Sequence, residues 1–264
     1  MDQTISKIKG HLRTLKLFRM EKALDGELAG AVAEGLAVST VVERLLEIEI
    51  NALIERRIER RIKESRLPER KLLADFDFAF QKGLDKAQIM ELATLSFVER
   101  KQGLIMAGSS GTGKSHIAKA LLLIGCRKLL RCRYTTGASM LKDLMSSLCD
   151  GTLDRKLRTY AAPDLLLIDE IGFDRLEQES SRHASLFFKV IDARYCKGST
   201  IATMNIDFKE LGDYLGDPVI TTALVDRMVH HSVLIHIEGP SYRMHESRKL
   251  NRSLDKDKQV GGPS

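Results

Sequence analysis

The chain has 264 residues, of which 43% are hydrophobic, and this length suits one medium domain or a small domain attached to a larger one. Its apolar runs are too short to span a bilayer, its first ten residues lack the apolar segment of a secretory signal, and its four cysteines form no CxxC pair. We therefore expect a cytoplasmic protein with reduced thiols and no membrane partner, whose net charge of +6 favours polyanions weakly.

Residues 1–70 contain no strand-like run, and we expect them to form an N-terminal helical domain. Apolar residues recur at helical spacing over 5–18, which predicts one helix there. A longer helix is predicted over 39–66, because Pro68 cannot continue it. Isoleucines four residues apart predict one apolar stripe on this helix: Ile50, Ile54, Ile58 and Ile62.

The end of this longer helix is strongly basic. Residues 56–71 contain eight basic and three acidic side chains, a difference of +5. Like charges spaced i, i+4 on a helix repel by about 0.2–0.5 kcal/mol, and a phosphate backbone would relieve that repulsion. The alternative is a solvated face on which Glu55 and Glu59 pair with the arginines. We favour contact with double-stranded DNA through Arg56, Arg57, Arg60 and Arg61.

From residue 103 onward the pattern changes to alternating strands and helices, after a bridge over 72–97 that includes a helix at 86–94. Strands are predicted at 103–107, 133–136, 165–169, 200–203 and 233–237. Helices are predicted at 115–130, 139–148, 152–160, 180–195, 207–215 and 220–230. Such alternation predicts an α/β fold, a parallel sheet with helices on both faces, and the fully apolar strand 165–169 is expected at its centre. Lys142, Lys156 and Arg158, on the two helices before that strand, are weaker DNA candidates.

A glycine-rich loop follows the first strand and begins the next helix. Gly108-Ser109-Ser110-Gly111-Thr112-Gly113-Lys114-Ser115 matches the pattern Gly-x4-Gly-Lys-Ser. The glycines let backbone N–H groups point at one phosphate, which also faces the positive end of the helix dipole. Lys114 can then reach the outer phosphates, and the Ser115 hydroxyl can bind Mg²⁺. We therefore expect ATP at this loop, with His116 among the residues that contact it.

Two of the predicted strands end in polar residues that could bind the metal and activate a water. Asp169 ends the apolar strand 165–169 and is expected to contact the Mg²⁺ together with Ser115. Glu170 follows it and can orient and deprotonate a water for attack on the γ-phosphate. Asn205, after the next strand, is expected to help hold that water. A water-activating Glu170 is not needed by a small-molecule kinase, so this pair favours ATP hydrolysis.

An added guanidinium stabilises the transition state of phosphoryl transfer, and another subunit can supply it. The sequence offers Arg227, Arg243 and, with less support, Arg194. By position alone, Arg227 and Arg243 are each more typical of a surface or salt-bridge arginine than of a phosphate ligand.

Together these residues resemble the AAA+ ATPases and, more narrowly, the IstB family, the ATP-binding helper proteins of IstA/IstB insertion sequences. This family shares a clade with the initiator DnaA and the helicase loader DnaC. The resemblance covers almost the whole chain, and its narrower part rests on short strings outside the ATPase motifs. These include Asp75-Phe76-Asp77-Phe78, Glu91-Leu92-Ala93-Thr94-Leu95, Gly216-Asp217-Pro218-Val219, Asp226-Arg227 with His230-His231, and Gly239-Pro240-Ser241-Tyr242-Arg243.

The resemblance implies a homo-oligomer that assembles on DNA with ATP, remodels that DNA and stimulates the partner transposase IstA. It implies that Arg227 acts in trans as an arginine finger, that Asn205 is the first sensor of the γ-phosphate, and that Arg243 is a second one. An AAA+ P-loop NTPase core would occupy residues 71–245. Only 27 residues follow Ile237, so we expect no full C-terminal lid, and 246–264 are expected to form a charged, disordered tail.

Three other functions stay open. A DnaC-like loader would use the same chemistry on a replicative helicase. A small-molecule kinase would pass the phosphate to a metabolite. A DNA-architectural protein would keep a nearly inert ATP site.

Overall fold

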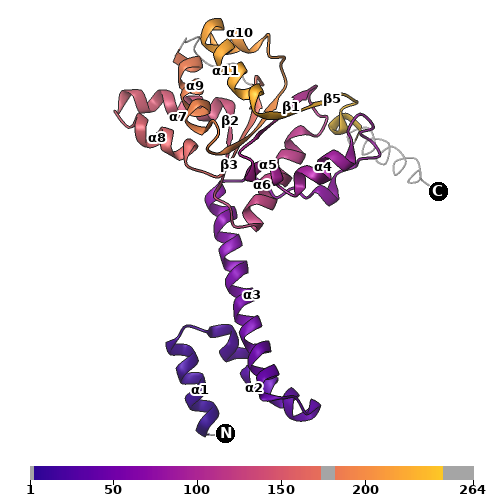
Figure 1. Ribbon diagram of the computed structural model, residues 1–264, viewed down its shortest axis with the longest axis vertical. Helices are drawn as coiled ribbons and strands as arrows, with labels where there is room; N and C mark the ends of the chain where they lie inside the picture. Colours follow the sequence, from indigo (N-terminus) through magenta and orange to yellow (C-terminus); the bar gives the residue numbers. More distant parts are fainter. Residues whose placement is uncertain (1–2, 174–181, 246–264) are drawn as a thin grey trace, which may run out of the picture. The chain divides into compact units, whose positions relative to one another are not determined.

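The computed structural model describes residues 3–173 and 182–245, and it divides into two compact units, Met1–Arg60 and Arg61–Ser264 (Figure 1). The division falls inside one long helix, upstream of residue 70, where we placed the end of the helical domain. The predicted tail 246–264 lies outside the described residues. Among the described helices, none has the length and apolar character needed to cross a membrane.

The first unit contains α1 (Gln3–Thr14), α2 (Phe18–Glu34) and most of α3 (Val38–Ser65). The single helix predicted over 5–18 is therefore wrong, because the chain breaks at Lys16, whose φ of +62° is left-handed. The buried Glu49 of α3 accepts hydrogen bonds from the backbone N–H groups of Arg19 and Met20, which caps the start of α2. A small apolar core holds the three helices together: Leu12, Leu24, Val41 and Leu45.

The predicted isoleucine stripe of α3 is not buried along its length. Ile50 and Ile54 are exposed, whereas Ile62, which belongs to the second unit, is buried.

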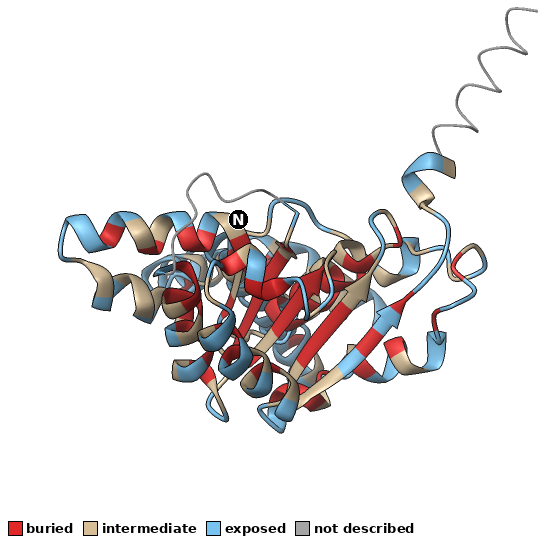
Figure 2. Ribbon diagram, turned by 90° about the horizontal axis from the view of Figure 1, so that it is seen from above, coloured by how far each residue is buried: buried red, intermediate tan, exposed pale blue. Residues whose placement is uncertain are grey.

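The second unit is built on a five-stranded sheet. Its strands are β1 (Gly103–Gly108), β2 (Cys132–Thr136), β3 (Leu165–Ile171), β4 (Ser199–Met204) and β5 (Ser232–Ile237). They lie in the order β2-β3-β4-β1-β5, and every neighbouring pair is parallel. The predicted α/β fold is therefore confirmed. The apolar β3 is an interior strand, but the middle position belongs to β4. Figure 2 shows buried residues concentrated along these strands.

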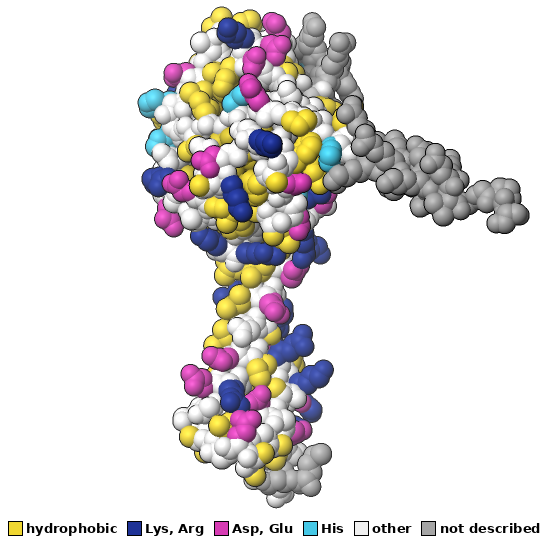
Figure 3. All heavy atoms as spheres, turned by 90° about the vertical axis from the view of Figure 1, so that its right-hand side faces the viewer, with side chains coloured by type: hydrophobic (Ala, Val, Ile, Leu, Met, Phe, Trp, Pro, Cys, Tyr) yellow, Lys and Arg dark blue, Asp and Glu magenta, His cyan; other side chains and the backbone are white. Residues whose placement is uncertain are grey.

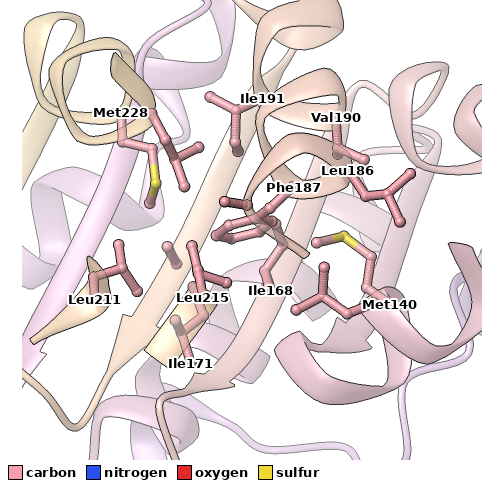
Figure 4. Packing of buried hydrophobic residues seen from close by; sticks show 14 of the residues in the cluster. Met140, Ile168, Ile171, Leu186, Phe187, Val190, Ile191, Leu211, Leu215 and Met228 are labelled. Carbon is pink, nitrogen blue, oxygen red and sulfur yellow. The ribbon is translucent and has the colours of Figure 1, made fainter. Parts of the chain in front are cut away.

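Helices cover both faces of the sheet. On one face lie α7 (Gly137–Cys149), α8 (Leu153–Ala161), α9 (Arg182–Arg194), α10 (Leu211–Leu215) and α11 (Pro218–His230). Figure 4 shows Phe187 of α9 packed over Ile168 of β3, with Met140 and Met228 on either side. On the other face lie α4 (Lys86–Ala93), α5 (Ser96–Glu99) and α6 (Lys114–Arg127). The short 3₁₀ helix η1 (Leu73–Asp75) comes before α4 in the chain and contacts α6. The helix predicted over 207–215 is shorter than expected, since α10 begins only at Leu211.

Candidate active site

The loop between β1 and α6 has a backbone path that only glycine can follow at three positions. Gly108, Gly111 and Gly113 have φ values of +140°, +81° and +98°. A Cβ on Gly108 would lie 2.2 Å from the carbonyl oxygen of Ile237, and one on Gly113 would lie 2.4 Å from the Phe76 ring. The loop is therefore held tightly between β5 and the segment before α4, with its backbone close to both.

Lys114 is the first residue of α6 and is buried. Its ammonium donates hydrogen bonds across the loop to the carbonyl oxygens of Gly108, at 2.7 Å, and Ser109, at 2.8 Å. Burial lowers the pKa of Lys114 to about 8; the negative charge of Asp169 opposes this shift and the positive charge of Arg243 adds to it. The ammonium thus lies where a phosphate could replace the two carbonyl oxygens as its partner.

The two residues predicted to bind a metal lie side by side. Asp169 of β3 is fully buried, and its Oδ1 accepts hydrogen bonds from the hydroxyls of Ser115, at 2.8 Å, and Thr203, at 2.5 Å. Its Oδ2 accepts a longer one, at 3.4 Å, from the phenol of Tyr134. Burial, the larger cause, and the negative charge of Asp169 both raise the pKa of the Tyr134 phenol. The phenol therefore keeps its proton and can donate a hydrogen bond to Asp169. A hydroxyl oxygen beside a carboxylate is a donor set that suits a hard cation such as Mg²⁺.

Glu170 occupies a strained position next to Asp169. Its φ is +60°, and the register between β3 and β4 shifts between Ile168 and Ile171, which marks a β-bulge. The Glu170 N–H donates to the Thr203 hydroxyl at 2.9 Å, instead of to a β4 carbonyl. Bulges re-aim side chains, and left-handed non-glycine residues concentrate at functional sites. The bulge directs Glu170 into the cavity that the phosphate loop also lines.

This cavity has a volume of about 480 Å³, a size typical of small-molecule sites. Its lining includes the loop from Ser110 to Ser115, and also Glu170, Asn205 and Arg243. His116 lines it as well, with Nε2 at 2.8 Å from the carbonyl oxygen of Leu72 and its ring edge-on to Phe76. Of the predicted site residues, the structure thus brings together the loop, the two carboxylates, Asn205 and Arg243.

Arg227 and Arg194 do not line this cavity. Arg227, on α11, forms an ion pair with Asp192 and lies over the rings of Phe188 and Tyr195, 5.0 and 5.7 Å from the centroids. Its side chain is 38% exposed, so it remains available at the surface.

The prediction that Arg194 could contact a phosphate is wrong, because its side chain is buried and hydrogen-bonded to other parts of the protein. Arg194 is 1% exposed and donates hydrogen bonds to the Thr200 hydroxyl and to four carbonyl oxygens, those of Tyr160, Ala161, Pro163 and Ser199. Burial lowers its pKa to about 10. Its guanidinium therefore ties the end of α8 to β4 and cannot reach a nucleotide.

The DNA candidates lie on three helices, and several carry acidic partners. Arg56 pairs with Glu49 at 3.1 Å, and Arg61 pairs with Glu64 at 3.3 Å. Arg57 and Arg60 are exposed on α3. Lys142 of α7 and Arg158 of α8 are exposed, whereas Lys156 pairs with Asp143 at 2.5 Å. Basic side chains in Figure 3 are interspersed with acidic ones on the face shown.

Sequence reasoning missed four residues of the site. Tyr134 and Thr203 contact Asp169, and the buried Gln81 donates through Nε2 to the carbonyl oxygen of Thr112 in the phosphate loop, at 2.9 Å. A fourth, Lys119, carries a signal in the sequence: it follows Ser115 by four residues, which places both on one face of α6.

A phosphate loop between β1 and α6, and a buried carboxylate at the end of β3 in a β2-β3-β4-β1-β5 parallel sheet, define a P-loop NTPase fold of the AAA+ type. Comparison with known proteins narrows the class. Residues 10–250 match the family model of the IstB-like ATP binding protein, and the chain belongs to that family.

The relatives agree with this assignment. The chain is 40% identical over 187 residues to the ATP-binding protein of insertion sequence IS21 from Pseudomonas aeruginosa, covering 71% of this chain and 69% of that protein. It is 36% identical over 195 residues to the ATP-binding protein of IS5376 from Geobacillus stearothermophilus, covering 74% of this chain and 76% of that protein. The crystal structure of DnaI shares the fold, with a TM-score of 0.53 at 20% identity over 64% of this chain and 92% of that one. The predicted family, fold and ATP binding are thereby confirmed.

Proposed function

We propose that this chain hydrolyses ATP as a switch for its assembly on double-stranded DNA, and that the assembled homo-oligomer remodels target DNA and stimulates the IstA-type transposase of its insertion sequence. The observation that carries the proposal is the placement of Glu170, beside Asp169, in the cavity that Lys114 and the phosphate loop line. Membership of a family whose relatives are named for insertion sequences supports the transposition part.

The site residues have complementary roles in hydrolysis. The backbone N–H groups of the loop and the ammonium of Lys114 hold the phosphates, with Ser115 and Asp169 as the ligands for Mg²⁺. When bound, Mg²⁺ would neutralise charge on the β- and γ-phosphate oxygens. Glu170 takes a proton from the attacking water, and Asn205 orients that water from the end of β4. Arg243, which lines the same cavity, adds positive charge within the chain.

The position of Arg227 supports an active site that is shared between subunits. This arginine lies outside the cavity of its own chain, and it is exposed on α11 beside the rings of Phe188 and Tyr195. We assign it to the cavity of a neighbouring copy, where its guanidinium would stabilise the transition state. Hydrolysis would then depend on assembly, because a lone copy lacks this charge.

Electron microscopy of the protein with duplex DNA, with and without ATP, tests the proposed switch. We expect ordered assemblies on DNA that form with ATP and dissociate as it is hydrolysed. Identical particles with and without ATP would contradict the switch, and negligible ATPase activity with DNA would favour an architectural protein. Capture of a replicative helicase in place of the transposase would assign the chain to helicase loading, and phosphate transfer to a metabolite would make it a kinase.

DNA binding is expected to depend on phosphate contacts from α3. Arg57→Ala should lower DNA affinity in the presence of ATP and reduce the slope of log K against log salt by about 0.9, the loss of one phosphate contact. Fluorescence anisotropy at several salt concentrations measures both quantities. Arg44→Ala is the matched control on the same helix, because Arg44 is also exposed but pairs with Glu34 far from the basic segment. Equal salt slopes for the two variants would remove Arg57 from the DNA contacts.

A further inference from the structure

Among the described residues, Lys119 is one of three lysines that line the nucleotide cavity, together with Lys71 and Lys114, and its ammonium lies beside Asp169. Its Nζ lies 3.6 Å from Oδ2 of Asp169 and 3.4 Å from Oε1 of Glu69, and it lies over the Tyr134 ring, 5.7 Å from the centroid. The side chain is only 12% exposed and lines the nucleotide cavity. Lys119 is thus a largely buried cation between two carboxylates, one of which is fully buried.

The two oxygens of Asp169 have different partners. Oδ1 accepts from the hydroxyls of Ser115 and Thr203, which carry no charge, whereas Oδ2 faces Tyr134 and Lys119. The ammonium of Lys114 is directed instead at the carbonyl oxygens of the phosphate loop. Within residues 3–173 and 182–245, Lys119 is therefore the cation that lies within ion-pair distance of Asp169. A buried carboxylate without such a partner is strongly unfavourable.

We propose that Lys119 is an internal counter-ion for Asp169, a positioning residue that supplies positive charge at the metal site when no divalent cation is bound. This proposal rests on the proposed nucleotide site. The ammonium lets the negatively charged phosphates enter beside a buried carboxylate without a metal. It also opposes the binding of a divalent cation alone, because that cation would meet a carboxylate whose charge is already balanced. The site is thereby biased towards accepting the cation together with the nucleotide.

The counter-ion role and a purely structural role predict opposite changes in the affinity for a divalent cation when Lys119 is removed. If Lys119 only held α6 against Glu69, its loss would weaken the binding of nucleotide and of divalent cation alike. If it balances Asp169, its loss strengthens the binding of a divalent cation alone, because the carboxylate becomes uncompensated. Its loss also weakens nucleotide binding without metal, because the negative charges of Asp169 and of the phosphates then face each other uncompensated. Nucleotide binding with Mg²⁺ should change little, because the cation replaces the missing charge.

The test compares Lys119→Met, which keeps the length of the side chain, with Lys119→Arg, which keeps the charge. Lys209→Met is the control, because Lys209 is exposed outside the cavity. Electron paramagnetic resonance measures Mn²⁺ binding to nucleotide-free protein, and a fluorescent ATP analogue reports affinity in EDTA and in Mg²⁺. For Lys119→Met we expect Mn²⁺ to bind about tenfold more tightly and the analogue to bind about tenfold more weakly in EDTA, each change being about 1.4 kcal/mol. Its affinity in Mg²⁺ should stay within about twofold of the parent.

Lys119→Arg and Lys209→Met should behave as the parent does. Weaker Mn²⁺ binding by Lys119→Met, or no change in either affinity, would overturn the counter-ion role. If Lys119→Met does not fold, Lys119→Gln carries the same expectations. A parent protein that binds no nucleotide would defeat the proposed ATP switch, and the Mn²⁺ measurement would still decide the role of Lys119.

Discussion

Replacing Lys114 by alanine should abolish ATP binding and, with it, ATP-dependent assembly on DNA. The variant removes the one charged group at the start of α6 whose ammonium already lies against the phosphate loop, 2.7 and 2.8 Å from two of its carbonyl oxygens. Hydrogen bonds to charged groups contribute about 1.5–3 kcal/mol each, so losing two to the phosphates should weaken binding by about 10²-fold or more. Isothermal titration calorimetry measures the affinity, and electron microscopy with DNA measures assembly.

The pKa of Lys114 supplies an independent check on the same charge. Burial lowers this pKa to about 8, so the side chain is mostly protonated at pH 7 and mostly neutral at pH 9. Phosphate binds the ammonium form, so nucleotide affinity should be nearly constant below about pH 7 and fall about tenfold between pH 7 and 9. Lys114→Arg keeps its charge and should show a flatter profile. A parent with a flat profile, or a Lys114→Ala variant that still assembles with ATP, would contradict the role given to this lysine.

The parts of the site that the sequence predicts are those carried by local patterns. The phosphate loop needs glycine at Gly108, Gly111 and Gly113 because of its own backbone path, and the structure places left-handed or similarly unusual φ values there. Asp169 is predictable because an apolar strand leads to it and the carboxyl ends of parallel strands meet at one edge. The parallel sheet follows from the alternation of strands and helices in the same way.

The parts that could not be predicted depend on contacts between distant segments. Thr203 joins Asp169 from a neighbouring strand, and its hydroxyl also accepts the Glu170 N–H, so the bulge in β3 depends on a side chain of β4. Arg194 has the same residue type as Arg227, and only the fold shows that one is buried under carbonyl oxygens and the other exposed. The break between α1 and α2 likewise needs Glu49, far along the chain, to cap α2.

Changing Glu170 to glutamine should separate ATP binding from hydrolysis. The amide keeps the size of the side chain, and the bulge is held by a backbone N–H bond to Thr203 that the substitution leaves in place. Glutamine cannot take a proton from water, so turnover should fall by about 10²–10⁴-fold, the usual contribution of a general base. ATP affinity should stay within about twofold of the parent, because Lys114, Ser115 and the loop N–H groups are unchanged. Phosphate release and calorimetry measure the two effects.

The same substitution tests the link between hydrolysis and the DNA-bound state. If hydrolysis releases the assembly, Glu170→Gln should remain on DNA with ATP far longer than the parent, as measured by dissociation after dilution. Glu91→Gln, at an exposed carboxylate of α4 outside the cavity, controls for the loss of one charge. Unchanged turnover would remove Glu170 as the base. Slow turnover with an unchanged DNA lifetime would keep Glu170 as the base but separate hydrolysis from release, so the switch would then depend on ATP binding alone.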